Sequence, residues 1–289
     1  MNSKLILGTV QFGLKYGINN TIGKPKKDEV LSLLKVAYNS GIRILDTAEA
    51  YGNAHKLIGN YHKRQDNSKF KIITKFPHDI KHNLIKSKVI EYLDLMKVNA
   101  LDVMMFHSFD SFKSNYNALE TLNELKSEKL INNIGVSVYT NTQLESLLDE
   151  DSITVVQLPF NVLDNFSVRG GLINKLKEKG KIIHTRSAFL QGLFFKKITD
   201  NLSIVQALKS HLKTLNKIAK KQGCSMEELA LSYCIRQKNI DNVIIGVDSI
   251  SQLNANIKAA AYEVNEEALK CINNINVENL SLLNPSLWR

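Results

Sequence analysis

The sequence predicts an α/β fold, a parallel eight-stranded (β/α)8 barrel in a single domain that spans residues 1–289. Short apolar or β-branched runs alternate with amphipathic stretches along the whole chain. Several runs, such as VVQL and NVIIG, are almost continuously apolar, which is typical of parallel strands covered on both faces. A doubly wound open sheet is the alternative, but it usually carries a glycine-rich phosphate loop after its first strand. The segment QFGLKYG stands there instead, which favours the barrel.

Eight candidate strands share a short apolar core. They are Leu5–Val10, Arg43–Asp46, Lys71–Lys75, Ala100–His107, Asn133–Val138, Thr154–Leu158, Lys181–Thr185 and Asn242–Gly246. Their number and the chain length of 289 residues both match a (β/α)8 barrel.

Amphipathic stretches follow most of these strands, with apolar residues three and four positions apart. In the first, which covers residues 28–41, Val30, Leu33, Leu34 and Ala37 share one face, and Gly41 provides a C-terminal stop. The other candidate helices are Asn53–Lys63, Leu84–Lys97, Asn115–Leu125, Thr142–Leu147, Gly170–Lys179, Ile204–Lys221, Ser225–Arg236, Ser249–Ala261 and Glu266–Ile275. No linker or low-complexity tract interrupts the alternation, so one domain is expected.

Composition and charge exclude several classes of protein. The net charge is 38 − 28 = +10, but the lysines are spread along the chain, so we expect a solvated surface and no nucleic-acid partner. Three cysteines without a CxxC spacing, Cys224, Cys234 and Cys271, exclude a disulfide scaffold and a cysteine-based zinc site, and we expect no metal. No apolar stretch approaches the ~20 residues of a membrane helix, and no signal pattern opens the chain. We therefore expect a cytoplasmic protein.

Polar side chains end three successive candidate strands. Asp46 ends the second, Lys75 the third and His107 the fourth, and Tyr51 follows Asp46 by five residues. In a barrel, the carboxyl ends of the strands form one mouth, where active sites are built. Singly, Asp46 could be a helix N-cap, Lys75 a solvated lysine, His107 a core-edge histidine and Tyr51 a rim residue. Because all four explanations would have to hold by coincidence, we interpret the residues as one catalytic group.

Together the four side chains form a proton donor for a carbonyl oxygen. A free tyrosine has a pKa of about 10, and a neighbouring ammonium stabilises its phenolate, so we expect Lys75 to lower the pKa of Tyr51. Asp46 would keep Lys75 charged and oriented, and His107 would donate a hydrogen bond to the same oxygen. The electrophilic carbon then needs a hydride, which indicates a nicotinamide cofactor.

The segment DTAEAYGN resembles the D-x-A-x-x-Y-G signature of the aldo-keto reductases. The resemblance continues through LGTVQFG, GVSVYTNTQLESLL, VVQLPFNVLD, RSAFLQGLF and VIIGVDSISQLNANIKA, and so runs nearly from end to end. It implies that Tyr51 is the general acid and that Asp46, Lys75 and His107 support it.

The resemblance also implies a set of cofactor-binding positions. Ser137 and Gln157 match positions that hold the nicotinamide carboxamide. The phosphate and adenine end is matched by Gly246, Ser249, Gln252 and Asn256. A glycine followed by a serine-capped helix offers free N–H groups and a positive dipole end to a phosphate, which agrees with this assignment.

Three positions depart from the family pattern. Val138 follows Ser137 where the family usually has Asn, so one carboxamide hydrogen bond is lost or moved. Arg186 stands where the family often has an aromatic ring; its guanidinium could stack on the nicotinamide, contact the pyrophosphate or point to solvent. Asp248 stands where many members face the 2′-phosphate, which it would repel, whereas it could accept hydrogen bonds from a free ribose. The family implies NADP (NADPH), and Asp248 leaves NAD (NADH) open.

The sequence thus predicts an NAD(P)H-dependent oxidoreductase that transfers hydride to an aldehyde or ketone, or oxidises the alcohol in reverse. Two alternatives stay open: a non-catalytic or slow cofactor-binding subunit that senses redox state, and a lyase or aldolase with Lys75 as a Schiff base. The short tail NPSLWR favours an open mouth, and RSAFLQG and IIGVDS look like members from carbohydrate metabolism. We therefore expect a sugar or a nucleotide-linked sugar as substrate. Nothing in the sequence indicates the oligomeric state.

Overall fold

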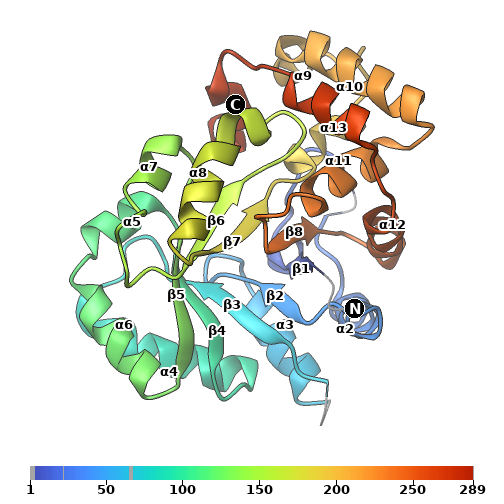
Figure 1. The fold of residues 1–289 in the computed structure, drawn as a ribbon. Helices are drawn as coiled ribbons and strands as arrows, with labels where there is room; N and C mark the ends of the chain where they lie inside the picture. Colours follow the sequence, from blue (N-terminus) through green and yellow to red (C-terminus); the bar gives the residue numbers. More distant parts are fainter. Residues whose placement is uncertain (1–3, 22, 65–67, 289) are drawn as a thin grey trace.

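The strands of the computed structural model, which describes residues 4–21, 23–64 and 68–288, run parallel and close into a barrel (Figure 1). They follow chain order, and β8 pairs with β1 to close the sheet. The described strands are β1 (Leu5–Gly8), β2 (Ile44–Asp46), β3 (Lys71–Lys75), β4 (Leu101–Phe106), β5 (Ile131–Ser137), β6 (Val155–Pro159), β7 (Ile182–Arg186) and β8 (Asn242–Gly246). The predicted (β/α)8 barrel is confirmed.

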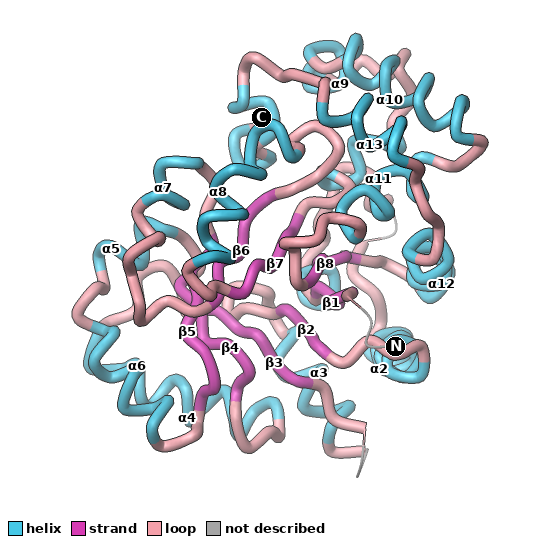
Figure 2. The backbone as a smooth tube through the Cα atoms, viewed as in Figure 1, coloured by secondary structure: helices cyan, strands magenta, loops and turns pink. Residues whose placement is uncertain are grey.

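Helices surround the strands as an outer ring (Figure 2). They are α1 (Val10–Gly13), α2 (Lys27–Asn39), α3 (Ala54–His62), α4 (Ile85–Met96), α5 (Phe109–Ser114), α6 (Ala118–Ser127), α7 (Asn141–Glu145), α8 (Phe166–Glu178), α9 (Ser203–Ala207), α10 (Lys209–Gln222), α11 (Met226–Ile235), α12 (Ile250–Ala260) and α13 (Glu266–Asn273). Short 3-10 helices are η1 (His82–Leu84), η2 (Leu190–Phe195), η3 (Leu280–Leu283) and η4 (Pro285–Leu287). Among the described residues, no helix combines the length and the apolar character that crossing a membrane requires.

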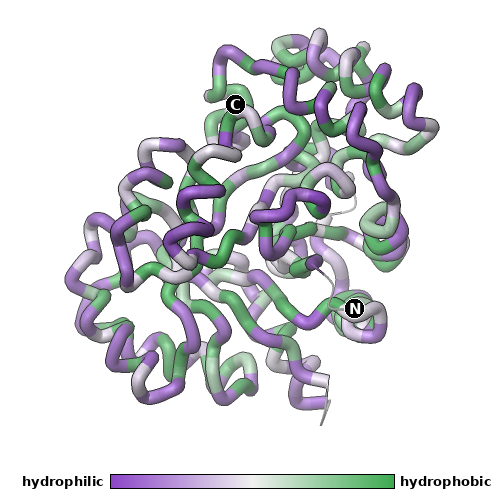
Figure 3. Tube along the Cα trace, in the orientation of Figure 1, coloured by the Kyte–Doolittle hydropathy of each residue, from purple (hydrophilic) through white to green (hydrophobic). Residues whose placement is uncertain are grey.

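Both faces of the barrel strands are apolar because each face packs against a different layer. Ile6, Ile73, Val103, Met105 and Val155 fill the barrel interior. The intervening strand residues point outward and pack against the helices in a second, larger core. Figure 3 shows hydrophobic colour along the strands and hydrophilic colour on outer helices such as α10 and α13. Burial on both faces explains the uninterrupted apolar runs in the sequence.

The first strand is shorter than predicted. It ends at Gly8, and not at Val10, because the chain turns at Thr9 and α1 begins. The Thr9 backbone N–H and hydroxyl both donate to the Asp46 carbonyl, at 2.9 and 3.0 Å. This turn joins the ends of β1 and β2 at the mouth of the barrel.

Other differences arise at helix ends. α8 begins at Phe166, earlier than the predicted Gly170, because the Asn165 side chain accepts the Ser167 N–H and caps the helix. The single helix predicted over residues 204–221 is two helices, α9 and α10, that meet at Leu208. α1 and α5, with four and six residues, are too short to give a periodic signal and were not predicted.

Candidate active site

A buried ion pair joins the carboxyl ends of β2 and β3. Lys75 Nζ lies 2.7 Å from Asp46 Oδ1 and 2.8 Å from Oδ2, and it donates a third hydrogen bond to the Thr47 carbonyl at 3.0 Å. The two side chains are only 1% and 6% exposed. The structure therefore brings together the acid and the base that the sequence places at successive strand ends.

Tyr51 and His107 lie beside this pair. Tyr51 follows β2, and Lys75 Nζ is 5.4 Å from the centre of its ring. His107 comes directly after β4, and its ring centre lies 5.8 Å from that of Tyr51, with the two rings at 75°. All four predicted catalytic residues thus converge at the mouth of the barrel.

Burial sets the protonation states of Tyr51 and His107. Burial, followed by the Asp46 carboxylate, raises the pKa of Tyr51 well above its ordinary value of 10.0. The expected net lowering of this pKa is wrong for this structure, because desolvation of the hydroxyl and the Asp46 carboxylate outweigh the Lys75 charge, which is paired with Asp46. Burial and the Lys75 charge lower the pKa of His107 to about 4. At neutral pH, Tyr51 keeps its proton, and His107 is neutral with one N–H donor.

Lys75 is not arranged as a nucleophile. Its ammonium has three N–H donors, and Asp46 and Thr47 offer an acceptor for each. Burial lowers the pKa of Lys75, and Asp46 opposes this shift. A Schiff base needs an accessible, unprotonated amine, so the engaged and buried ammonium argues against the lyase or aldolase alternative.

A cavity of about 260 Å³ opens at this end of the barrel. Most of the site residues predicted from the sequence line it: Asp46, Tyr51, Gln157, Arg186, Gly246, Asp248, Gln252 and Asn256. The remaining predicted residues are not part of the lining: Lys75, His107, Ser137 and Ser249. Lys75 and His107 nevertheless lie beside the ring of Tyr51, which lines the cavity. They can therefore influence a ligand there through Tyr51.

Gln157 of β6 connects the ion pair to the cavity. Its Nε2 donates to Asp46 Oδ2 at 2.8 Å. No hydrogen bond to its amide oxygen is found within the described ranges, so that oxygen suits the N–H of a carboxamide. Ser137 is the neighbour of Gln157 in the register of β5 and β6 but does not line the cavity. The fit to a carboxamide therefore rests on Gln157.

The β8 end of the cavity fits the phosphate and ribose groups of a dinucleotide. Gly246 lies against the Gln11 side chain, and a Cβ at this position would lie 2.5 Å from Gln11 Nε2. The absence of a side chain therefore leaves the backbone of Gly246 open to a ligand. Gln11 Oε1 is buried and has no hydrogen-bond partner among the described residues. The next element, α12, is capped by Ser249, whose Oγ accepts the Gln252 N–H at 3.2 Å. Unused N–H groups in the first turn of such a helix suit a phosphate.

Arg186 stacks on the ring of Tyr139, a residue that was not among the predicted site residues. Its guanidinium carbon lies 4.1 Å from the centre of the Tyr139 ring, and Nη2 donates to the Val138 carbonyl at 3.1 Å. Arg186 lines the cavity, so it does not simply point to solvent. Its positive charge acts on both Tyr51 and His107. Among the described lining residues, no other side chain is cationic.

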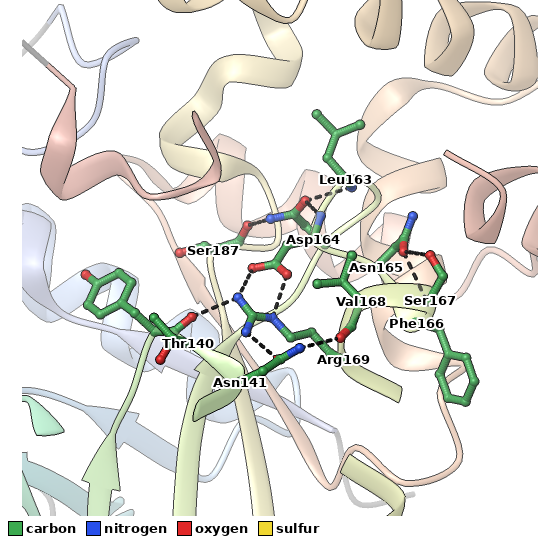
Figure 4. Close-up of polar contacts among 12 residues, drawn as sticks. Thr140, Asn141, Leu163, Asp164, Asn165, Phe166, Ser167, Val168, Arg169 and Ser187 are labelled. Carbon is green, nitrogen blue, oxygen red and sulfur yellow. Dashed lines mark hydrogen bonds and ion pairs between the residues drawn. The ribbon is translucent and has the colours of Figure 1, made fainter. Parts of the chain in front are cut away.

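A buried network holds the loops after β5 and β6 together (Figure 4). Arg169 of α8 donates to both oxygens of Asp164, from Nε at 2.6 Å and from Nη2 at 2.9 Å. It also donates to the Asn141 side chain and to the Tyr139 carbonyl, both at 2.8 Å. The network therefore fixes the backbone of Tyr139, the residue on which Arg186 stacks.

One feature of the sequence points to this network. The segment PFNVLD places Asn161 and Asp164 directly after an apolar strand, and buried polar side chains need partners. In the structure, Asn161 Nδ2 donates to the Ser187 carbonyl at 3.2 Å and so ties the loop after β7 to the same cluster.

The loop after α1 crosses to η2 and bridges the mouth. The Ile18 N–H donates to the Gln191 carbonyl at 3.2 Å, and the Asn19 side chain donates to the Gly192 carbonyl. Asn20 Nδ2 donates to Asp248 Oδ1 at 3.1 Å. The mouth is thus less open than the short C-terminal tail led us to expect.

The residues that the structure describes give no indication of a metal site. Within residues 4–21, 23–64 and 68–288, no group of three or more His, Cys, Asp or Glu side chains could hold a metal ion.

Comparisons with known proteins place these features in a family. The sequence profile of the Aldo/keto reductase family matches residues 4–277. The uncharacterized oxidoreductase YqkF of Bacillus subtilis is 25% identical over 274 residues, covering 86% of this chain and 87% of YqkF. L-galactose dehydrogenase of Arabidopsis thaliana is 24% identical, covering 89% of this chain and 86% of that protein. The aldo-keto reductase AKR11C1 from Bacillus halodurans (holo form) shares the fold with a TM-score of 0.78 at 20% identity, covering 95% of this chain and 92% of that one. The chain belongs to the aldo/keto reductase family and is an oxidoreductase.

Proposed function

We propose that this protein reduces an aldehyde or ketone with a reduced nicotinamide dinucleotide, and that Tyr51 is the general acid. One observation carries the proposal: a buried Lys75–Asp46 pair lies beside Tyr51, which lines the cavity and keeps its proton at neutral pH. A carbonyl oxygen in the cavity next to Tyr51 meets a proton donor that is held in place.

Each catalytic side chain has a separate role in this reaction. Tyr51 donates its proton to the carbonyl oxygen as negative charge develops there. The neutral imidazole of His107 donates a hydrogen bond to the same oxygen. Lys75, held by Asp46, stabilises the phenolate that remains after the transfer. When bound, the cofactor supplies a hydride to the carbonyl carbon.

The residues that hold the cofactor lie along the cavity. Gln157 would hold the carboxamide, and Gly246, Gln252 and the N-terminus of α12 would hold the phosphate and adenosine groups. We assign the protein to the cytoplasm, where its thiols Cys224, Cys234 and Cys271, which are free in the structure, stay reduced.

At neutral pH, Tyr51 is in the protonation state that reduction requires. Burial raises the pKa of Tyr51, so the phenolate that would accept a proton from an alcohol is scarce. The reverse oxidation should therefore need alkaline conditions.

As substrate we propose a sugar or a nucleotide-linked sugar. Arg186 offers a cationic guanidinium beside Tyr51, which favours a substrate that carries a negative group. Asn19, Asn20 and Gln191 add polar side chains to the lining, and these suit hydroxyl groups. L-galactose dehydrogenase, by its name an enzyme of sugar oxidation, is a relative.

A substrate panel tests both parts of the proposal. Purified protein is mixed with reduced cofactor and with aldoses, sugar phosphates, nucleotide-linked keto-sugars or simple aldehydes, and cofactor oxidation is followed by absorbance. We expect turnover, with the anionic sugars having the highest kcat/KM. Turnover of simple aldehydes alone would overturn the substrate assignment, and cofactor binding without turnover of any carbonyl would overturn the reductase.

A further inference from the structure

Two carboxylates lie at the β8 end of the cavity. Asp248 comes directly before the Ser249 cap of α12, and Glu227 lies in the first turn of α11. The two helices pack side by side (Figure 1), so residues far apart in sequence line one cavity together with Gln252. The sequence singled out Asp248 but not Glu227, because only the packing of α11 on α12 brings Glu227 to the site.

Among the described residues that line the cavity, no cationic side chain lies at this end with the two carboxylates. The one cationic side chain among the described lining residues is Arg186, which ends β7 and acts on Tyr51 at the opposite end. Lys258 of α12 is exposed and does not line the cavity. It lies eight residues after the first residue of α12, which is about 12 Å along the helix axis.

Asp248 is held in a fixed orientation. Its Oδ1 accepts a hydrogen bond from Asn20 Nδ2 at 3.1 Å, and its backbone N–H donates to Gln252 Oε1 at 2.8 Å. The Gln252 side chain also interacts with the Asp248 carboxylate. The backbone N–H that a phosphate could use at this position is therefore taken, while the carboxylate of Asp248 lines the cavity.

A third acceptor lies at the same end. Gln11 Oε1 is buried without a partner among the described residues, and its amide packs against Gly246. Glu227, Asp248 and Gln11 together make this end of the cavity rich in acceptors. Such a surface suits a ligand group that donates hydrogen bonds, such as the two hydroxyls of an unmodified ribose. A 2′-phosphate at neutral pH is a charged acceptor and meets two carboxylates instead.

We propose that Glu227 and Asp248 select NADH over NADPH. The inference rests on the proposed function, because it assumes that a nicotinamide dinucleotide occupies the cavity. A pyrophosphate at the N-terminus of α12 would bring the adenosine ribose attached to it near the residues that border this terminus. The ribose 2′-hydroxyl donates to a carboxylate, whereas the 2′-phosphate is repelled. This reverses the preference for NADPH that the family resemblance implies.

Binding titrations of the full chain test the proposal without relying on turnover. NADH and NADPH are titrated separately at low salt, and the quenching of protein fluorescence gives each Kd. We expect NADH to bind at least about tenfold more tightly than NADPH. The ratio should fall as salt is added, because screening weakens the repulsion.

Substitutions that remove the charge of each carboxylate test whether Glu227 and Asp248 cause the preference for NADH over NADPH. Glu227→Gln and Asp248→Asn keep the shape of each side chain and remove its charge, so the double variant should lower the NADPH/NADH ratio of Kd values by about tenfold or more. Asp248→Arg should move the preference further toward NADPH. Glu120→Gln, an exposed residue of α6 outside the cavity, makes the same charge change and should leave the ratio unaltered.

The outcomes separate this inference from the proposed function. Equal or tighter binding of NADPH by the wild type, or a ratio that the double variant does not change, would overturn the role of the carboxylates and leave the reductase intact. Failure of both dinucleotides to bind would overturn the proposed function itself.

Discussion

Two buried ion pairs lie near the mouth of the barrel. Both join a cationic side chain to an aspartate, but the two cations have different further contacts. Lys75–Asp46 has its shortest contact at 2.7 Å and Arg169–Asp164 at 2.6 Å, and all four side chains are at most 6% exposed. Burying an ion pair costs free energy of desolvation that the attraction often fails to recover. Each pair therefore needs an explanation beyond stability.

The difference lies in what each cation touches besides its carboxylate. Lys75 has one further partner, the Thr47 carbonyl, and its charge lies beside the Tyr51 ring. Arg169 reaches the loop after β5 at two points through its broad guanidinium, the Asn141 side chain and the Tyr139 carbonyl. The first pair is compact and faces Tyr51, the proposed general acid, and the second joins loops.

In both pairs, the pKa shifts show that burial disfavours the charged form of the side chain. Burial lowers the pKa of Lys75 despite Asp46 and raises the pKa of Asp164 despite Arg169. In each case desolvation outweighs the partner. The lesson is that burial and geometry alone do not distinguish a catalytic pair from a scaffolding pair, whereas their further contacts do.

The largest expected effect comes from breaking the catalytic pair. Lys75→Met should lower turnover by about 10²- to 10⁴-fold, because Tyr51 loses the charge that stabilises its phenolate. It should also lower the free energy of unfolding by about 3–5 kcal/mol, because Asp46 stays buried without its partner. Steady-state kinetics at a temperature where the variant is folded, with urea unfolding alongside, measure the two effects.

A matched variant controls for the loss of a lysine from β3. Lys71 begins the same strand and is exposed, so Lys71→Met should keep turnover and stability close to those of the wild type. Normal turnover by Lys75→Met would contradict the role given to the pair.

Breaking the scaffolding pair should have a similar effect on stability and a much smaller one on chemistry. Arg169→Met leaves Asp164 buried and unpaired, so we expect a loss of about 3–5 kcal/mol in the free energy of unfolding. Turnover by the folded fraction should stay within about tenfold of the wild type, with KM rising more than kcat falls, because the Tyr139 loop shifts and the reacting groups do not. A folded Arg169→Met variant that is as inactive as Lys75→Met would remove the distinction between the pairs.

Acid should affect the surroundings of the catalytic pair first. Burial, with a smaller effect of Lys75, lowers the pKa of His55, His107 and His184 to about 4, from an ordinary value of 6.5. Between these values the unfolded chain binds more protons than the folded one, so the free energy of unfolding should fall as the pH decreases through this range. Around the scaffolding pair, protonation of Asp164 has the opposite sign, because its pKa is raised.

Urea unfolding at about pH 7 and about pH 5 measures this loss of stability. His184→Gln should make the difference between the two pH values smaller, because one titrating group is removed. A stability that does not depend on pH in this range would show that the three histidines are not held neutral by burial.

The convergence of Asp46 and Lys75 could be predicted from the sequence because it follows from strand order. Asp46 and Lys75 end neighbouring strands, and any parallel barrel brings such residues together. The role of Arg169 could not be predicted, because its partners lie in the loops after β5 and β6 and only the tertiary fold joins them. Glu227 was missed for the same reason. The raised pKa of Tyr51 was also beyond the sequence, because it depends on how completely the hydroxyl is buried.

The most direct test of the account is a single-turnover comparison of the wild type with Tyr51→Phe. Each protein is saturated with reduced cofactor and mixed rapidly with a carbonyl substrate, and cofactor affinity is measured separately. Tyr61→Phe serves as the control, since Tyr61 is a buried tyrosine of α3 that does not line the cavity. We predict that Tyr51→Phe lowers the rate of hydride transfer by about 10²- to 10⁴-fold and leaves cofactor affinity within a few-fold. Near-normal hydride transfer by Tyr51→Phe would contradict the assignment of Tyr51 as the general acid.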